Sequence, residues 1–184
     1  MDLGANVGMF STFASRLSQR VLAFEPLPAN YEQLRRNAGT RPNVTLLRQA
    51  VAGEPGTLRI YRAAHPKLGG TPSAYREGNQ LLSDDFDEAP ATTLDAVFEE
   101  HGVDRCDLLK IDVEGSEYEL LRAASDATLA RIQRIHGEYH DVRADDPGTR
   151  IDAFAGWLRA KGFKVDVDAH PRKPNHGMFF AARA

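Results

Sequence analysis

The sequence has few of the features that stabilise secreted proteins or anchor membrane proteins. It contains a single cysteine, Cys106, so no disulfide bond can form within the chain. No apolar run approaches the roughly 20 residues that cross a bilayer, and no basic-then-apolar leader precedes Asp2. From these absences we expect a cytoplasmic protein that has no membrane partner.

An excess of charge of one sign is also missing. The chain has 23 Lys and Arg residues against 26 Asp and Glu residues, a net charge of −3. Without a basic excess the protein has no overall positive electrostatic field to attract the phosphates of nucleic acid. We therefore expect a small-molecule partner and no nucleic acid. Repeats are absent too, and a length of 184 residues suits one domain spanning residues 1–184. The oligomeric state is left open.

Apolar segments of strand length alternate with helical stretches, a pattern typical of an α/β sheet. We expect strands at residues 21–24, 44–51, 57–62, 108–113, 132–140, 163–167 and 177–182, and helices at residues 7–17, 29–38, 92–101 and 151–161. A further helix, which carries Tyr118, Leu120 and Leu121, should follow the turn at residues 115–116. In the first helix Phe13 and Leu17 belong to a stripe that should face the core.

Turn formers and polar residues fill the connections of this pattern. Residues 53–56 are turn formers, so residues 44–51 and 57–62 should form a hairpin at the sheet edge. Residues 63–91 are rich in glycine, proline and acidic residues, which is typical of a lid or substrate loop. Thr92 and Asp95 have the spacing of a helix capping box.

The stretch Asp2-Leu3-Gly4-Ala5-Asn6-Val7-Gly8 indicates a ligand seat between a strand and a helix. Gly4 and Gly8 place no side chain against a bound molecule, and the helix start offers unpaired N–H groups. The spacing D-x-G-x-x-x-G differs from the dinucleotide fingerprint G-x-G-x-x-G. It favours S-adenosylmethionine, whose positive groups attract carboxylates, over a nicotinamide dinucleotide. A strand–turn–helix without a ligand is the alternative.

A second acidic residue, Glu25, ends the apolar run of residues 21–24 and is followed by Pro26, which stops the strand. In doubly wound folds an acidic residue about 20 positions beyond the glycine turn accepts hydrogen bonds from ribose hydroxyls. Gln49 and Ala50 lie near the end of the next strand, where an adenine ring can bind. A purely structural role fits these two residues at least as well.

Two more carboxylates, Asp112 and Glu114, stand at the carboxyl end of the strand at residues 108–113. Ligands bind at this edge of an open α/β sheet. The pair suggests a metal site or a general base, and the charges alone favour neither. Since the spacing of metal-ligating residue types is not compact, we predict no essential metal. Lys110 is expected to pair with Asp112.

Histidines end the next strand. His136 and His140 are both candidate proton acceptors, although a histidine at such a place is more often only hydrogen-bonded. We retain His140 as a candidate catalytic residue.

In order, the motifs DLGANVG, FEP, AVAGEPGTL, TLD and DLLKIDVEGSEYELLRAA closely resemble the FkbM-type family of S-adenosylmethionine-dependent methyltransferases. The resemblance runs from Asp2 to about His140. It implies the class I methyltransferase fold, a seven-stranded sheet of order 3-2-1-4-5-7-6 whose last strand is antiparallel and whose first strand is short here. It also implies O-methylation of a hydroxyl on a sugar or polyketide-like natural product.

The resemblance carries site residues with it, position by position. It implies that Asp2, Gly4, Asn6 and Gly8 line the methionine end of the cofactor, that Glu25 holds the ribose, and that Asp112 and Glu114 lie near the methyl group and the acceptor. With the neighbouring Ala5 and Pro26, and with Gln49 and Ala50 from their place at a strand end, these residues other than Glu114 make up the predicted cofactor site. Glu114 is the expected proton acceptor and His140 the alternate one, while Asp112 chiefly shapes the cofactor side. A different class of function is a truncated, non-catalytic relative that binds a nucleoside ligand or a protein partner.

Overall fold

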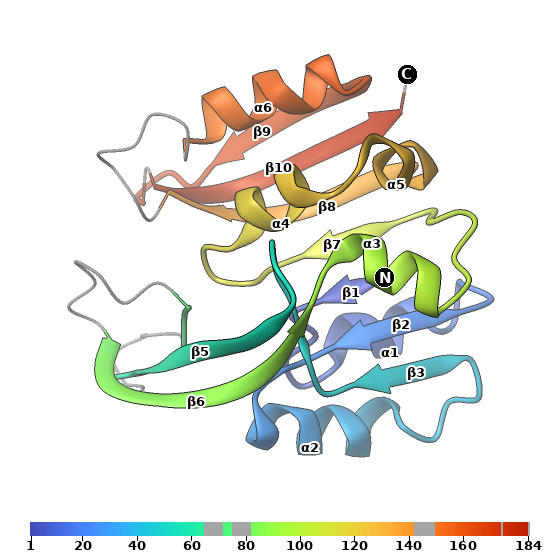
Figure 1. Ribbon diagram of the computed structural model, residues 1–184, viewed down its shortest axis with the longest axis vertical. Coiled ribbons are helices and arrows are strands. Elements are labelled where there is room, and N and C mark those ends of the chain that lie inside the picture. Colours follow the sequence, from blue (N-terminus) through green and yellow to red (C-terminus); the bar gives the residue numbers. More distant parts are fainter. Residues whose placement is uncertain (65–71, 75–81, 142–149, 174, 184) are drawn as a thin grey trace.

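The computed structural model describes residues 1–64, 72–74, 82–141, 150–173 and 175–183. A seven-stranded sheet forms its centre (Figure 1). From one edge to the other its strands are β3 (Val44–Leu47), β2 (Val21–Phe24), β1 (Asp2–Leu3), β7 (Leu109–Ile111), β8 (Arg134–His140), β10 (His176–Arg183) and β9 (Phe163–Ala169). The helices are α1 (Met9–Ala14), α2 (Pro28–Ala38), α3 (Leu94–Glu100), α4 (Glu117–Ala123), α5 (Asp126–Arg131) and α6 (Ile151–Ala160).

The directions of the strands match the expectation from the family. The five strands β3, β2, β1, β7 and β8 are parallel to one another, and β10 is antiparallel to both β8 and β9. Counted along the chain within this sheet alone, the order is 3-2-1-4-5-7-6 with an antiparallel last strand. The predicted fold class is confirmed. Although β1 has only two residues, it pairs on both sides, and Leu3 is fully buried.

Side chains that alternate along β2 separate the core into two faces. Leu22 and Phe24 pack in the larger cluster, which includes buried residues of α3, α4, α5 and α6. Ala23 points the other way and packs in a smaller cluster with Leu34 and Ala38 of α2. In Figure 1 α3, α4 and α5 are drawn in front of the sheet and α1 behind it. Helices therefore cover both faces of the sheet around β1 and β2.

The first helix is shorter than predicted. It begins at Met9, because Gly8 is in a left-handed conformation, and it ends at Ala14. Leu17 therefore lies beyond the helix, and Phe13 and Leu17 are 60% and 75% exposed. The prediction that these two residues face the core was wrong. The helix ends before Leu17, and the buried side chain of the helix is Ser11, so Phe13 lies on its solvent side.

A second sheet of three strands was not predicted. Its order is β4 (Ala50–Val51), β6 (Leu82–Thr92) and β5 (Gly56–Ala63). The expected strand at residues 44–51 is thus broken after Leu47, where the chain leaves the main sheet. The expected hairpin was also wrong, because β5 pairs antiparallel with β6, and β4 pairs parallel with β6.

The long β6 strand lies within the segment that the sequence indicated as a loop. Two of its acidic residues make ion pairs across the β5–β6 ladder: Glu88 with Arg59 at 3.2 Å and Asp87 with Arg62 at 2.6 Å. These pairs explain why a polar segment forms a strand, which composition alone does not reveal. Residues 65–71 and 75–81 of the expected loop lie outside the described residues.

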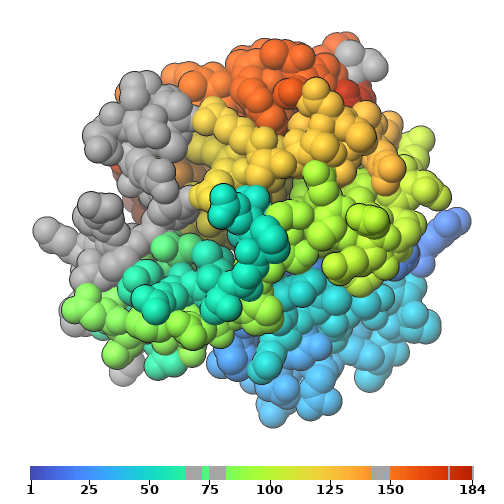
Figure 2. Space-filling model, in the orientation of Figure 1, coloured from blue at the N-terminus to red at the C-terminus, as the bar shows by residue number. Residues whose placement is uncertain are grey.

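The β5–β6 ladder forms a curved arm on one side of the molecule (Figures 1 and 2). At its end the chain enters α3, whose N-cap is Thr93, with its side chain accepting a hydrogen bond from the Ala96 N–H group. The predicted capping box was therefore one residue out of place. Asp95 instead accepts hydrogen bonds from Ser125. Within the described part of the chain, no helix is long and apolar enough to cross a membrane.

Candidate functional site

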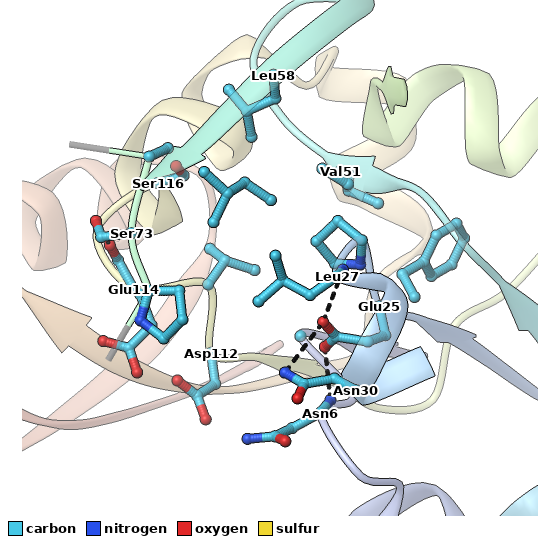
Figure 3. Close-up of a pocket in the computed structure, with 18 of the residues that line it drawn as sticks. Asn6, Glu25, Leu27, Asn30, Val51, Leu58, Ser73, Asp112, Glu114 and Ser116 are labelled. Atoms are coloured by element: carbon cyan, nitrogen blue, oxygen red, sulfur yellow. Dashed lines mark hydrogen bonds between the residues drawn. The ribbon is translucent and has the colours of Figure 1, made fainter. Parts of the chain in front are cut away.

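A cavity of about 780 Å³, its open mouth included, lies at the carboxyl ends of β1, β2 and β7. Residues of the second sheet line its opposite side (Figure 3). The described lining residues are Gly4, Asn6, Phe24, Glu25, Pro26, Leu27, Asn30, Gln49, Ala50, Val51, Leu58, Ile60, Pro72, Ser73, Ala74, Asp112, Val113, Glu114 and Ser116. Its position at the carboxyl edge of parallel strands is where small ligands bind in open α/β sheets.

The glycine turn joins β1 to α1 under one end of this cavity. Gly4 and Asn6 have left-handed backbones, with φ of 74° and 50°. A Cβ atom on Gly4 would stand 1.8 Å from the Asp112 carbonyl oxygen. The absence of a side chain at Gly4 therefore lets the ends of β1 and β7 approach each other, a role different from the open ligand seat that the sequence suggested.

Glu25 stands at the tip of β2 and is only 4% exposed. Its carboxylate accepts hydrogen bonds from the N–H groups of Asn6 at 2.8 Å and Leu27 at 3.0 Å. The Asn30 amide donates a third, at 3.4 Å. Burial raises the pKa of Glu25, while these hydrogen bonds act in the opposite direction. The carboxylate is thus tied to the glycine turn and also lines the cavity (Figure 3).

The far side of the cavity is apolar. Val51 of β4 and Leu58 and Ile60 of β5 line it, and Leu27 lies between them and Glu25 (Figure 3). Gln49 and Ala50 stand at the entrance to β4, where the chain crosses from the main sheet to the second sheet. A planar ring with polar edges suits this combination of apolar walls and a few polar groups.

The near side of the cavity is acidic. Asp112 and Glu114 follow β7, and their carboxylates point the same way in Figure 3. Lys110 Nζ lies 3.5 Å from Asp112 and 3.4 Å from Asp2 and donates to the Gly4 carbonyl at 2.8 Å. The predicted pairing of Lys110 with Asp112 is confirmed. Lys110 thus links the strand tip to the glycine turn.

Glu114 has a left-handed backbone, with φ of 55°. Its carbonyl oxygen accepts a hydrogen bond from the Ser73 hydroxyl at 2.6 Å. Ser73 is also bridged to Tyr61 of β5 through backbone hydrogen bonds. The second sheet is therefore fastened to the loop that carries the candidate proton acceptor.

Behind Glu114 lies His140, which is 4% exposed and does not line the cavity. Its Nε2 is 3.3 Å from Glu114 and 3.8 Å from Glu138, and its Nδ1 is 2.9 Å from Glu117. Burial lowers the pKa of His140, but the hydrogen bond to Glu117 and the charges of Glu117, Glu114 and Glu138 outweigh it and raise the pKa to about 9. At neutral pH the ring is therefore an imidazolium ion.

Three of the acidic and histidine residues near the cavity could hold a metal ion. Asp112, Glu114 and His140 each offer a ligand atom, and these atoms lie within 4.8 Å of one another. Carboxylate oxygens and an imidazole nitrogen are common ligands of divalent metals. Our expectation that no metal is essential therefore stays a prediction.

The structure brings most of the sequence-predicted residues to one cavity. Those that line it are Gly4, Asn6, Glu25, Pro26, Gln49, Ala50, Asp112 and Glu114. Asp2, Ala5 and Gly8 are absent from its described lining. Asp2 is fully buried and accepts a hydrogen bond from Ser11 of α1 at 2.6 Å, so its place is to hold α1 against the turn.

Sequence reasoning missed several residues of the site. Val51, Leu58 and Ile60 escaped because the second sheet was not predicted. Asn30 lies five residues after Glu25, in the first turn of α2, and this short spacing is a signal that the sequence offers. Glu117 lies in the motif that was used, yet its full burial and its contact with His140 are tertiary facts.

The model of the family described as the methyltransferase FkbM domain matches residues 2–165. The chain belongs to this family. It is 32% identical over 197 residues to the 31-O-demethyl-FK506 methyltransferase FkbM of Streptomyces tacrolimicus, covering 92% of this chain and 74% of that protein. It is 31% identical over 201 residues to the AMB antimetabolite synthetase AmbE of Pseudomonas aeruginosa. That match covers 91% of this chain but only 10% of the synthetase.

Solved structures share the fold. The methyltransferase FkbM from Methylobacillus flagellatus KT aligns with a TM-score of 0.61 at 17% identity, over 98% of this FkbM-family chain and 42% of that one. Fibrillarin from Aeropyrum pernix, solved with natively bound S-adenosylmethionine, aligns with a TM-score of 0.51 at 15% identity, over 98% and 64%. The chain is an S-adenosylmethionine-dependent methyltransferase of the class I fold.

The described residues suit this cofactor. Glu25 presents a carboxylate that can accept hydrogen bonds from a ribose diol. The apolar wall of Val51, Leu58 and Ile60 suits an adenine ring. Asp112 and Glu114 place negative charge at the other end, where the cofactor's positive groups would lie.

Proposed function

We propose that this FkbM-family protein transfers a methyl group to a hydroxyl of a small, uncharged molecule, such as a sugar or a natural product. The observation that carries the proposal is the placement of the Glu114 carboxylate on the cavity that also contains Glu25. One cavity thus combines a group suited to the cofactor's ribose with a group suited to take a proton. The name of the Streptomyces relative, a demethyl-FK506 methyltransferase, supports a natural-product acceptor.

S-adenosylmethionine, when bound, supplies an electrophilic methyl group on a positively charged sulfur. The acceptor oxygen must lose its hydroxyl proton as it gains the methyl group. Glu114 is placed to take that proton as a general base, with its carboxylate 3.3 Å from His140 Nε2. Because the buried His140 is protonated at neutral pH, it makes an ion pair with the Glu114 carboxylate that holds Glu114 in place. It is not the first base.

The rest of the work is positioning. Aligning the acceptor oxygen with the methyl group converts an encounter of two molecules into a reaction within one complex, which accounts for much of the rate gain of such enzymes. Pro72, Ser73 and Ala74 line the cavity next to Glu114, and the Ser73 hydroxyl donates a hydrogen bond to the Glu114 carbonyl oxygen. These residues are suited to hold the body of the acceptor.

The charge at the cavity bears on the acceptor class. Asp112, Glu114 and Glu138 gather at the strand tips, and burial followed by the charge of Asp112 raises the pKa of Glu138. A second anion brought beside these carboxylates would meet repulsion. Neutral polyhydroxyl acceptors should therefore be preferred over carboxylated ones.

Titration calorimetry with S-adenosylmethionine and S-adenosylhomocysteine tests the cofactor part of the proposal. Methyl transfer from radiolabelled S-adenosylmethionine to a panel of neutral glycosides, hexuronates and macrolide alcohols tests the acceptor part. We expect cofactor binding and a preference for neutral hydroxyl compounds. Binding with label appearing only on amines or carboxylates would refute methylation of a hydroxyl. No binding by folded protein would favour the non-catalytic relative.

Glu114→Gln is the decisive variant. It keeps the size of the side chain but removes the basic oxygen, so turnover should fall by roughly 10²–10⁴ while cofactor affinity stays nearly the same. Glu99→Gln is the matched control, because it removes one carboxylate from an exposed position on α3. Wild-type turnover in Glu114→Gln would show that another group takes the proton.

A further inference from the structure

Glu117, the first residue of α4, is a charged side chain with no exposed surface. Its two carboxylate oxygens each accept a hydrogen bond from the Gly115 N–H group at 3.0 Å. One of them also lies 3.3 Å from the Val113 nitrogen and 2.9 Å from His140 Nδ1. A carboxylate is buried at low cost only when donors surround it. Glu117 therefore joins α4, the loop after β7 and the end of β8.

The first of these connections fixes the backbone around Glu114. Glu114 has φ of 55° and Gly115 has φ of 113°, both in the left-handed region that few non-glycine residues adopt. Glu117 accepts hydrogen bonds from the backbone N–H groups of Val113 and Gly115, the residues on either side of Glu114. This clamp stabilises the conformation that directs the Glu114 side chain to the cavity.

The second connection fixes the imidazole of His140. Backbone N–H groups can only donate, so Glu117 acts as an ionised acceptor, and His140 Nδ1 must carry a hydrogen. Nε2 is then directed at Glu114, 3.3 Å away, and at Glu138, 3.8 Å away. Among the described residues, two further titratable groups lie near the ring: Asp112, with a carboxylate oxygen within 4.8 Å of a ring nitrogen, and His176 of β10, whose ring meets that of His140 edge-on at 4.9 Å.

We propose that Glu117 is a positioning residue for methyl transfer, which holds both the loop of Glu114 and the ring of His140 so that the Glu114 carboxylate meets the acceptor hydroxyl. Glu117 does not line the cavity, so it acts only through these two neighbours. The inference rests on the proposed role of Glu114 as proton acceptor. It gives a task in the reaction to a residue buried behind the site.

Glu117→Gln separates these functions from simple packing. The glutamine side chain has nearly the same shape, but it offers one acceptor oxygen and one donor amide in place of two acceptors. Its oxygen can keep the place of Oε1, which faces the Val113 and Gly115 N–H groups and His140 Nδ1, but its amide nitrogen then replaces the second oxygen that accepts from the Gly115 N–H group. The negative charge that favours the imidazolium ion is removed.

Nuclear magnetic resonance of the imidazole nitrogens measures the protonation of His140 directly and needs no methyl-acceptor substrate. In the wild type we expect His140 to titrate near pH 9 and to keep its Nδ1 hydrogen when neutral. In Glu117→Gln the midpoint should fall by about 1 pH unit or more. Turnover of any hydroxyl acceptor found for the wild type should fall about 10–100-fold, with affinity for S-adenosylhomocysteine within about threefold.

Glu100→Gln, which removes an exposed carboxylate from α3, is the control and should leave the midpoint and the turnover unchanged. The proposal is overturned if the neutral ring of wild-type His140 carries its hydrogen on Nε2, a result that needs no variant to fold. It is also overturned if the His140 midpoint does not move in Glu117→Gln, or if S-adenosylhomocysteine affinity falls in step with turnover. Absence of any methylated hydroxyl product with wild-type protein refutes the proposed function instead, whatever the nitrogen spectra show.

Discussion

The buried imidazolium of His140 predicts that the protein loses stability between pH 6.5 and pH 9. Folding raises the pKa of His140 from 6.5 to about 9, because Glu117, Glu114 and Glu138 outweigh the effect of burial. A group whose pKa is raised by folding stabilises the folded state fully below the unfolded value, and this contribution is lost as pH rises through the folded value. In this window the folded state binds the extra proton.

The magnitude follows from the same two values. Each pH unit between them corresponds to about 1.4 kcal/mol, so the interval from 6.5 to about 9 is worth at most roughly 3.5 kcal/mol of unfolding free energy. The His140 side chain is 5% exposed, so screening by water removes little of this. Set against a typical domain stability of about 5–15 kcal/mol, the loss is easily measured.

Urea unfolding at intervals between pH 6 and pH 9 is the assay, with His140→Asn as the comparison. The asparagine amide can still donate to Glu117 but does not titrate in this range. Burial also raises the pKa of the Cys106 thiol, but both proteins contain Cys106, so the difference between the two curves isolates His140. A wild-type curve that is flat across this window would refute the reasoning, as would equal slopes in the two proteins.

Three further changes test other parts of the site. Glu25→Ala should weaken S-adenosylmethionine binding by about 1–3 kcal/mol in calorimetry. It should also lower the unfolding free energy by a similar amount, because two backbone N–H groups lose their acceptor; full affinity in this variant would remove Glu25 from the cofactor site. Gly4→Ala should destabilise the fold by about 2 kcal/mol or more, because its Cβ atom would meet the Asp112 carbonyl, and an unchanged melting temperature would contradict that approach of the two strands. Dialysis against EDTA should leave methyl transfer intact, whereas a loss that magnesium or manganese restores would assign a metal to the group containing Asp112.

The main sheet was predictable because its signals are local. β2 and β7 are short, mostly apolar strands that are each followed by an acidic residue, and the motifs that mark the strand tips occur in a fixed order. Glu25 and Asp112 were found in this way, since each directly follows a buried strand. The residue that directly follows a parallel strand is therefore placed at the carboxyl edge of the sheet.

The second sheet and the buried half of the site were not predictable, because both depend on contacts between distant segments. β6 is stabilised by partners some 25 to 29 residues away in the chain, such as Arg62 for Asp87 and Arg59 for Glu88. Likewise, nothing local marks Glu117 as buried, since an acidic residue in the first turn of a helix is ordinarily exposed and favoured there by the helix dipole. Only the approach of β8 gives it a histidine partner, 23 residues along the chain.

The hydrogen bond from the Asn6 N–H group to Glu25 makes the glycine turn and the tip of β2 a single mechanical unit. A ligand that contacts either the turn or the strand tip therefore stabilises the folded conformation of both. The amide of Asn6 should exchange with solvent deuterium more slowly when S-adenosylhomocysteine is bound, even if the ligand never touches that nitrogen. Exchange at this one amide thus reports on occupancy of the ribose end of the cavity, and it can screen cofactor analogues before any acceptor is known.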